Sequence, residues 1–237
     1  MRAQPEQQAP PVQRLRVRYA KRGRLRFTSH RDFSRAFERA LVRARIPMAY
    51  SSGFNPHPRI SYAGASPTGA ASEAEYLEIG LAEEVDPVAL AARLDEALPV
   101  GLDVVEVVLA TPGSLADRLE ASRWRLDLAG VGLDDARRAV DAFLAADAVE
   151  VQRMTKKGLR TFDSRAAVLA LGVTAYDAGS RLEVVLRHTE PMVRPDDLLT
   201  GLHGVGGLDV PAAPLVTRLA QGPLDATGGT IGDPLSG

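Results

Sequence analysis

The order in which two hydrophobic periodicities follow one another restricts the folds open to this chain. Apolar and polar residues alternate at residues 14–19 and 75–81, as in a strand with one exposed face. Amphipathic patterns of period 3.6 predict helices at 29–46 and 86–98, each between predicted strands. Together the predicted strands are 14–19, 60–63, 75–81 and 102–110. The order β-α-β-β-α-β is the ferredoxin-like pattern.

A similar order can be read again after residue 122. The predicted strands there are 124–128, 149–154 and 181–188, with an apolar segment at 166–175 and an extended segment at 208–219. The predicted helices are 134–146 and 195–203. We therefore predict an α+β fold of two ferredoxin-like βαββαβ halves that form a pseudo-repeat, at 14–112 and 123–220. Residues 1–13 and 221–237, which are rich in Gln, Pro or Gly, are expected to be a disordered lead-in and a disordered tail.

The chain contains no cysteine, which excludes several kinds of chemistry. It rules out disulfides, a thiol nucleophile and iron–sulfur clusters held by its own thiolates. No apolar run approaches the roughly 20 residues of a membrane span, and the N-terminus lacks the apolar core of a signal peptide. We expect a cytoplasmic protein with no membrane partner, and the residue spacings match no metal or cofactor motif.

A net charge of −1 conceals a strong asymmetry along the chain. Residues 14–45 contain twelve Lys or Arg and only two acids, whereas residues 46–237 contain sixteen basic and twenty-seven acidic residues. A basic segment on an acidic body is typical of proteins that bind a polyanion. The excess of Arg over Lys also allows compositional bias, but bias does not explain why the arginines concentrate in one segment.

The predicted helix at 29–46 carries much of this charge. Ser29 is a suitable N-cap, and Asp32 follows three residues later. Six apolar residues with helical spacing predict a face that packs against a core, and arginines recur every fourth residue on the other face, at Arg31, Arg35, Arg39 and Arg43. Such a face is either simply solvated or suited to phosphates, and the basic residues at 14–26 favour RNA. Lys156 and Lys157 form a second predicted basic tip.

The segment after this helix combines residues that shape loops. Glycine permits positive φ, asparagine forms Asx-turns, and proline stiffens the chain. We predict a binding loop, with Phe54 either a stacking platform for a base or a buried plug. The loop and its neighbour at the helix start consist of Ser29, Ser51, Gly53, Phe54, Asn55, Pro56, His57 and Pro58.

A different interpretation places catalysis in the same region. His30 begins the predicted helix, and His57 lies between two prolines. With Asp32 and Glu75 they form a candidate His₂-carboxylate or acid–base site. The alternative is that His30 caps the helix and His57 makes a loop hydrogen bond.

Several of these residues also carry a resemblance. They are Arg26-Phe27, Ser29-His30, Asp32, Phe37-Glu38-Arg39-Ala40, Tyr50-Ser51, Gly53-Phe54-Asn55-Pro56-His57-Pro58, Gly69, Ser72-Glu73-Ala74-Glu75-Tyr76, Lys156-Lys157-Gly158 and Asp163-Ser164-Arg165. In them the chain resembles a bacterial family of radical S-adenosylmethionine (radical SAM)-linked proteins, also described as domain of unknown function 2344, over roughly residues 14–220. The resemblance implies a radical SAM protein as partner, and it implies no reaction.

Three functions follow as expectations. A radical SAM enzyme needs cysteine thiolates for its cluster, so this chain is not that enzyme itself. The first expectation is an accessory RNA-binding subunit in tRNA or rRNA modification or processing. The second is a metal- or acid/base-dependent enzyme on a nucleotide or small molecule, and the third is an adaptor that contacts only proteins.

Overall fold

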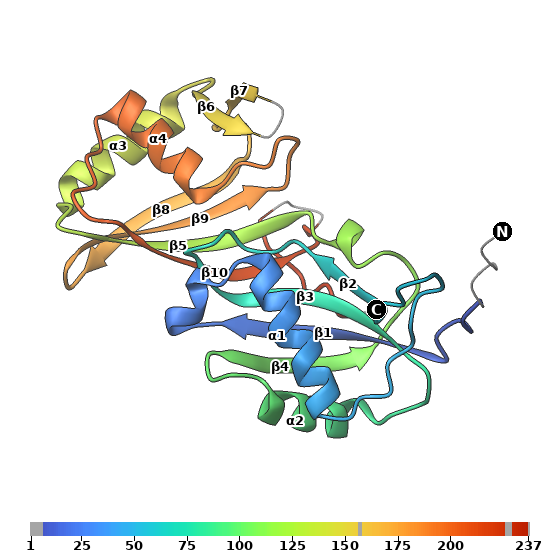
Figure 1. Ribbon diagram of the computed structural model, residues 1–237. Coiled ribbons are helices and arrows are strands. Elements are labelled where there is room, and N and C mark those ends of the chain that lie inside the picture. Colours follow the sequence, from blue (N-terminus) through green and yellow to red (C-terminus); the bar gives the residue numbers. More distant parts are fainter. Residues whose placement is uncertain (1–6, 156–157, 226–228, 237) are drawn as a thin grey trace. The chain divides into compact units, whose positions relative to one another are not determined.

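The computed structural model describes residues 7–155, 158–225 and 229–236, and the chain divides into two compact units (Figure 1). The N-terminal unit contains Met1–Asp117 and Pro234–Gly237, and the C-terminal unit contains Arg118–Asp233. The division falls inside the predicted connection at 113–122. The described residues form a mixed α/β structure with four α-helices and mostly antiparallel strands.

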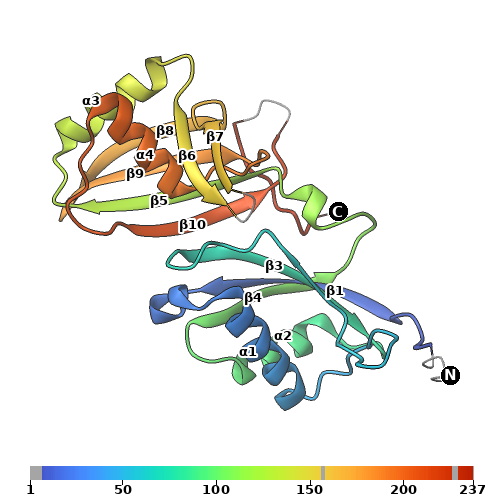
Figure 2. The same ribbon diagram turned by 45° about the horizontal axis from the view of Figure 1, so that its top comes forward.

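The N-terminal unit is one antiparallel sheet with two helices on one face (Figure 2). Its elements in chain order are β1 (Gln13–Lys21), the 3₁₀ helix η1 (Gly23–Phe27), α1 (His30–Arg43), β2 (Ile60–Ala63), β3 (Ala71–Leu81), α2 (Pro87–Ala97) and β4 (Leu102–Leu109). β1 pairs with β4 on one side and with β3 on the other, and β2 pairs with β3. The strand order is therefore β4-β1-β3-β2.

The strand register separates an apolar face from a polar one in this unit. Leu15 lies opposite Ile79 and Val17 opposite Leu77, and all four are buried on the helix side. The apolar stripe predicted for α1 completes the core, because Phe33, Phe37, Ala40 and Leu41 are buried there. The residues between them on β1 and β3, including Arg16 and Glu78, consequently point to the face away from α1 and α2.

Two local predictions differ from the structure. Leu25 and Phe27, for which the sequence predicts a continued first strand or the start of a hairpin, belong to a 3₁₀ helix. α1 ends at Arg43, before the predicted end at Ile46, because Arg45 has a φ of 52°, which a helix cannot contain. The start of α1 agrees with the predicted cap, since the Asp32 N–H donates to Ser29 Oγ at 3.2 Å.

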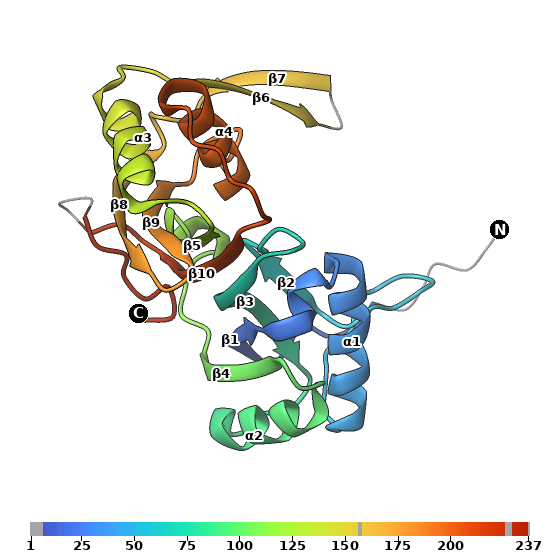
Figure 3. The same cartoon turned by 90° about the vertical axis from the view of Figure 1, so that its left-hand side faces the viewer.

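The C-terminal unit has the same kind of sheet with an added hairpin (Figure 3). Its elements are the short 3₁₀ helix η2 (Ala116–Arg118, at the boundary), β5 (Ala121–Ala129), α3 (Leu133–Ala145), β6 (Glu150–Thr155), β7 (Gly158–Asp163), β8 (Val168–Tyr176), β9 (Gly179–Arg187), α4 (Pro195–Gly206) and β10 (Leu215–Gly222). The sheet order within the unit is β10-β5-β9-β8, and β6 pairs only with β7 among the described strands.

The last predicted strand is displaced toward the C-terminus. It was expected at 208–219, whereas β10 runs from Leu215 to Gly222 and so enters the segment predicted to be a tail. Beyond it, Leu224 forms an isolated bridge with Ile231, and Leu235 is buried. This segment therefore contains paired and buried residues although it is rich in Gly and Pro.

Glycines decide how closely α3 and α4 approach. A Cβ added to Gly206 would lie 2.7 Å from Ala139 Cβ and still closer to its Cα, whereas a Cβ at Gly204 would meet nothing within 4 Å. We expect Gly206→Ala to lower the free energy of unfolding by about 2 kcal/mol through overpacking. Gly204→Ala should raise it by about 0.5–1 kcal/mol, because alanine favours the helix. Urea denaturation measures both, and equal effects of the two substitutions would contradict this packing.

Candidate nucleic-acid interface

The outer face of α1 presents a row of cations to solvent. Arg31, Arg35, Arg39 and Arg43 are all exposed, as the sequence predicts. None of the four makes a hydrogen bond or ion pair with a residue that the structure describes. Their guanidinium groups are therefore available to an external anion. We call these four residues the α1 arginine row.

Other arginines of the N-terminal segment are committed to the protein. Arg16 is fully buried, and its guanidinium donates to Glu78 Oε2 at 3.2 Å, to Thr111 Oγ1 at 2.8 Å, to Thr111 O at 2.9 Å and to Gly113 O at 2.6 Å. Arg18 Nε donates to Glu73 O at 3.0 Å. The expectation that strand arginines extend the basic surface is therefore wrong for Arg16, because its donors are used internally.

Arg22 is a further case of an arginine with internal partners. It pairs with Glu73 and, at 2.8 Å, with Asp103. These acids raise the pKa of the Arg22 guanidinium, with the hydrogen bond to Glu73 as the largest cause. The α1 arginine row differs from these arginines, because its guanidinium groups have no partner among the described residues.

The predicted binding loop is a closed turn with an exposed tip. The Ser51 N–H donates to His57 O at 2.8 Å, and the His57 N–H donates to Ser51 Oγ at 3.0 Å. Gly53 has a φ of 135°, which favours glycine, and nothing lies within 4 Å of a Cβ built there. The Phe54 side chain is 68% exposed. Phe54 is therefore no buried plug, and its ring is free to stack.

At the N-terminus of α1, His30 contacts an aromatic cluster. Its ring packs edge-on against Tyr62 at a centroid distance of 4.8 Å, and Tyr62 also contacts Phe33. Burial raises the pKa of Tyr62, and the Glu38 carboxylate adds to this shift while the Ser34 hydroxyl opposes it. The Tyr62 hydroxyl is buried and makes no hydrogen bond of normal geometry with a described residue.

Two of the four candidate catalytic residues have hydrogen-bond partners elsewhere in the protein. Asp32 accepts a hydrogen bond from Ser29 Oγ at 2.6 Å, so it belongs to the helix cap. Glu75 is buried and accepts from the Ser66 N–H at 3.1 Å. Within the described ranges, no group of His, Asp and Glu side chains can hold a metal ion.

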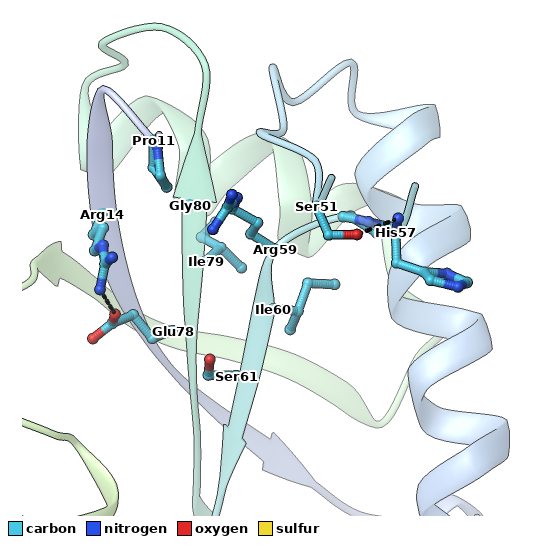
Figure 4. A pocket seen from close by; sticks show the side chains of 11 residues that line it. Pro11, Arg14, Ser51, His57, Arg59, Ile60, Ser61, Glu78, Ile79 and Gly80 are labelled. Atoms are coloured by element: carbon cyan, nitrogen blue, oxygen red, sulfur yellow. Dashed lines mark hydrogen bonds and ion pairs between the residues drawn. The ribbon is translucent and has the colours of Figure 1, made fainter. Parts of the chain in front are cut away.

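A pocket lies on the polar face of the sheet beside the loop (Figure 4). Its volume is about 300 Å³. Residues of the loop, of β1, of β2 and of β3 line it, among them Arg14, His57, Arg59, Ser61 and Glu78. The pocket has no signature in the sequence, because it depends on the pairing of three strands.

The comparisons with known proteins give a family. The model of an uncharacterised protein family conserved in bacteria, domain of unknown function 2344, matches residues 14–195. The chain belongs to this family. No curated protein matches it. Among solved structures it is similar to a chain in a crystal structure of a Cbf5-Nop10-Gar1 complex, at 12% identity with a TM-score of 0.47. The similarity covers 92% of this chain and 55% of that chain, so this family member spans about half the length of that neighbour.

Two further features of this family member concern its surface. Phe27 is 59% exposed, and the Arg26 guanidinium lies 4.5 Å from its ring centroid, which forms a second aromatic platform near the start of α1. In the sequence, the Arg26-Phe27 pair contributes only to the family resemblance. Lys156 and Lys157 lie outside the described residues, and no described helix is long and apolar enough to cross a membrane.

Proposed function

We propose that this protein is an accessory RNA-binding subunit that presents structured RNA, such as tRNA or rRNA, for modification or processing. The observation that carries the proposal is the α1 arginine row, in which four guanidinium groups at i+4 spacing are exposed and unpaired among the described residues. An arginine fork binds phosphate through two parallel hydrogen bonds. Internal pairing of Arg16 and Arg22 supports the interpretation that the row is free for another purpose.

Exposed aromatic rings support the same proposal. Phe54 and Phe27 lie at two ends of the segment that contains α1, and both rings are more than half exposed. Bases of single-stranded RNA stack on such rings, and stacking contributes about 1–3 kcal/mol per base. Arginines for phosphates and aromatic side chains for bases are the two components that RNA recognition outside a duplex requires.

The proposed partner is a radical SAM protein. This part rests on the family resemblance and on the absence of cysteine, which requires that any iron–sulfur cluster be held by another chain. We also propose that the two units are ferredoxin-like halves of a pseudo-repeat. The matching strand orders, β4-β1-β3-β2 and β10-β5-β9-β8, support it when the β6–β7 hairpin is treated as an insertion.

Crosslinking in bacterial cells followed by denaturing purification of the tagged chain tests this proposal. We expect covalently attached RNA, with crosslinked peptides from α1 and from residues 51–58, and a radical SAM protein in the same sample. Peptide mapping by mass spectrometry distinguishes these surfaces from the rest of the chain. Recovery of RNA with no crosslink in the N-terminal unit would overturn the assignment of the interface, and recovery of protein partners without RNA would favour the adaptor.

A further inference from the structure

The pocket beside the loop is built by the register of three strands. Arg14 of β1 lies opposite Gly80 of β3, and Glu78 of β3 lies opposite Ser61 of β2. Since Leu15 and Ile79 point to the core, these four residues share the face away from α1 and α2. Arg59 joins them from the end of the loop, because the Gly80 N–H donates to Arg59 O at 2.9 Å.

Two cations flank β3 in this pocket. In Figure 4 the Arg59 guanidinium lies over β3 beside Gly80, and Arg14 lies on the other side of that strand. Arg59 uses only Nε in a hydrogen bond, to Tyr50 O at 3.0 Å, so its terminal nitrogens have no partner among the residues described. Arg14 is 62% exposed, and its single ion pair, with Glu78, is long at 3.5 Å. Both forks can therefore receive an anion.

The one carboxylate in the pocket is already compensated. Glu78 Oε2 accepts from the buried Arg16 at 3.2 Å, and Oε1 faces Arg14. With Arg14, Arg16 and Arg59 around it, Glu78 does not cancel the positive potential of the pocket. Each carboxylate oxygen retains a lone pair that can accept from a hydroxyl. The pocket thus joins an anion site to a hydroxyl acceptor, with the exposed Ser61 as a further hydroxyl partner.

The rest of the lining consists mostly of proline, isoleucine and glycine. Pro58 and His57 come from the loop, and Pro11 packs on Gly80, where an added Cβ would lie 2.8 Å from Pro11 Cγ. The proline rings offer apolar contact to a base. The volume of about 300 Å³ is at the lower end of small-molecule sites, which range over roughly 300–1,000 Å³.

We propose that this pocket binds a phosphorylated ribonucleoside. The phosphate lies between Arg14 and Arg59, the ribose hydroxyls donate to Glu78, and the base packs on Pro58 at the end of the loop. The ligand is either a free nucleotide or the 5′-phosphorylated end of an RNA chain, and the second source rests on the proposed function. The pocket is separate from the α1 arginine row, which lies on the helix side of the sheet.

Calorimetry with adenosine 5′-monophosphate tests the proposal. We expect adenosine, which lacks the phosphate, to bind about tenfold or more weakly than adenosine 5′-monophosphate. The double variant Arg14→Met/Arg59→Met should weaken binding of the monophosphate by a similar factor. Ser61→Phe, at an exposed position, should block the pocket while the circular dichroism spectrum stays native. The control Arg137→Met/Arg138→Met, on α3, removes the same charge and should leave binding unchanged.

Two 12-nucleotide RNAs of one sequence, with a 5′-phosphate or a 5′-hydroxyl, distinguish the sources. A preference for the 5′-phosphate that Ser61→Phe abolishes identifies an RNA end, whereas binding of the mononucleotide alone identifies a free nucleotide. The proposal is overturned if neither the mononucleotide nor the 5′-phosphorylated RNA binds, or if no pocket variant weakens their binding. RNA binding that still depends on Arg35 and Arg39 would then leave the proposed function intact. Nucleotide binding without RNA binding would support the pocket and contradict the proposed function.

Discussion

Replacing Arg35 and Arg39 by glutamate should weaken RNA binding about 100-fold or more at moderate salt. Both guanidinium groups are exposed on the middle of α1 and have no internal partner in the described structure. Loss of two charge-assisted phosphate contacts, each of about 1.5–3 kcal/mol, and their replacement by repulsive carboxylates act in the same direction. Fluorescence anisotropy with a labelled tRNA measures the change, and the effect should be independent of sequence.

A matched control separates this contact from a general effect of charge. Arg137→Glu/Arg138→Glu changes the net charge equally on another exposed helix, where both arginines pair with acids of their own turn. That variant should bind RNA within a few-fold of the unmodified protein. A further variant changes all four arginines of the α1 arginine row to glutamine. In it, the steepness with which log K decreases with log salt should be smaller by about 3, at roughly 0.7 per phosphate contact. Equal losses in both helix variants would contradict the interface on α1.

Arg16→Met should lower the free energy of unfolding by about 3 kcal/mol, although it replaces a charge by an apolar side chain of similar length. The arginine is fully buried and supplies four hydrogen bonds, and three of its acceptors belong to Thr111 and Gly113. These part-buried acceptors lose a charged donor, and Glu78 loses its closest cation. Arg16→Lys should recover only part of the loss, because one ammonium cannot reproduce the fork.

Urea denaturation followed by far-ultraviolet circular dichroism measures this change. Fluorescence of the single Trp reports on the C-terminal unit, because Trp124 lies there, and it should change less. Arg14→Met is the control, since Arg14 is 62% exposed and its ion pair is long. It should alter the stability by less than about 0.5 kcal/mol. Equal effects at the two positions would show that the buried network contributes little.

Much of the secondary structure could be predicted because it depends on local periodicity. β2 begins and ends at the predicted residues, and α1, α2 and α3 begin within one residue of prediction. The ends of elements were less accurate where the backbone decides them, as at Arg45, whose positive φ no periodicity reveals. Placing the last strand at 208–219 also failed, because hydrophobic content alone does not show where pairing with β5 begins.

The amino-acid sequence alone predicts that one helix has an apolar face and an arginine face, because both follow from a repeat of about 3.6 residues. It could not determine which arginines are free. Arg16 and Arg35 are equally basic, but only Arg16 meets acceptors that come from 95 to 97 residues later in the chain. Likewise, Arg14, Arg59 and Ser61 surround one pocket because strand pairing brings distant residues onto one face. Tertiary structure decided these points, since hydrogen bonds and burial depend on neighbours in space.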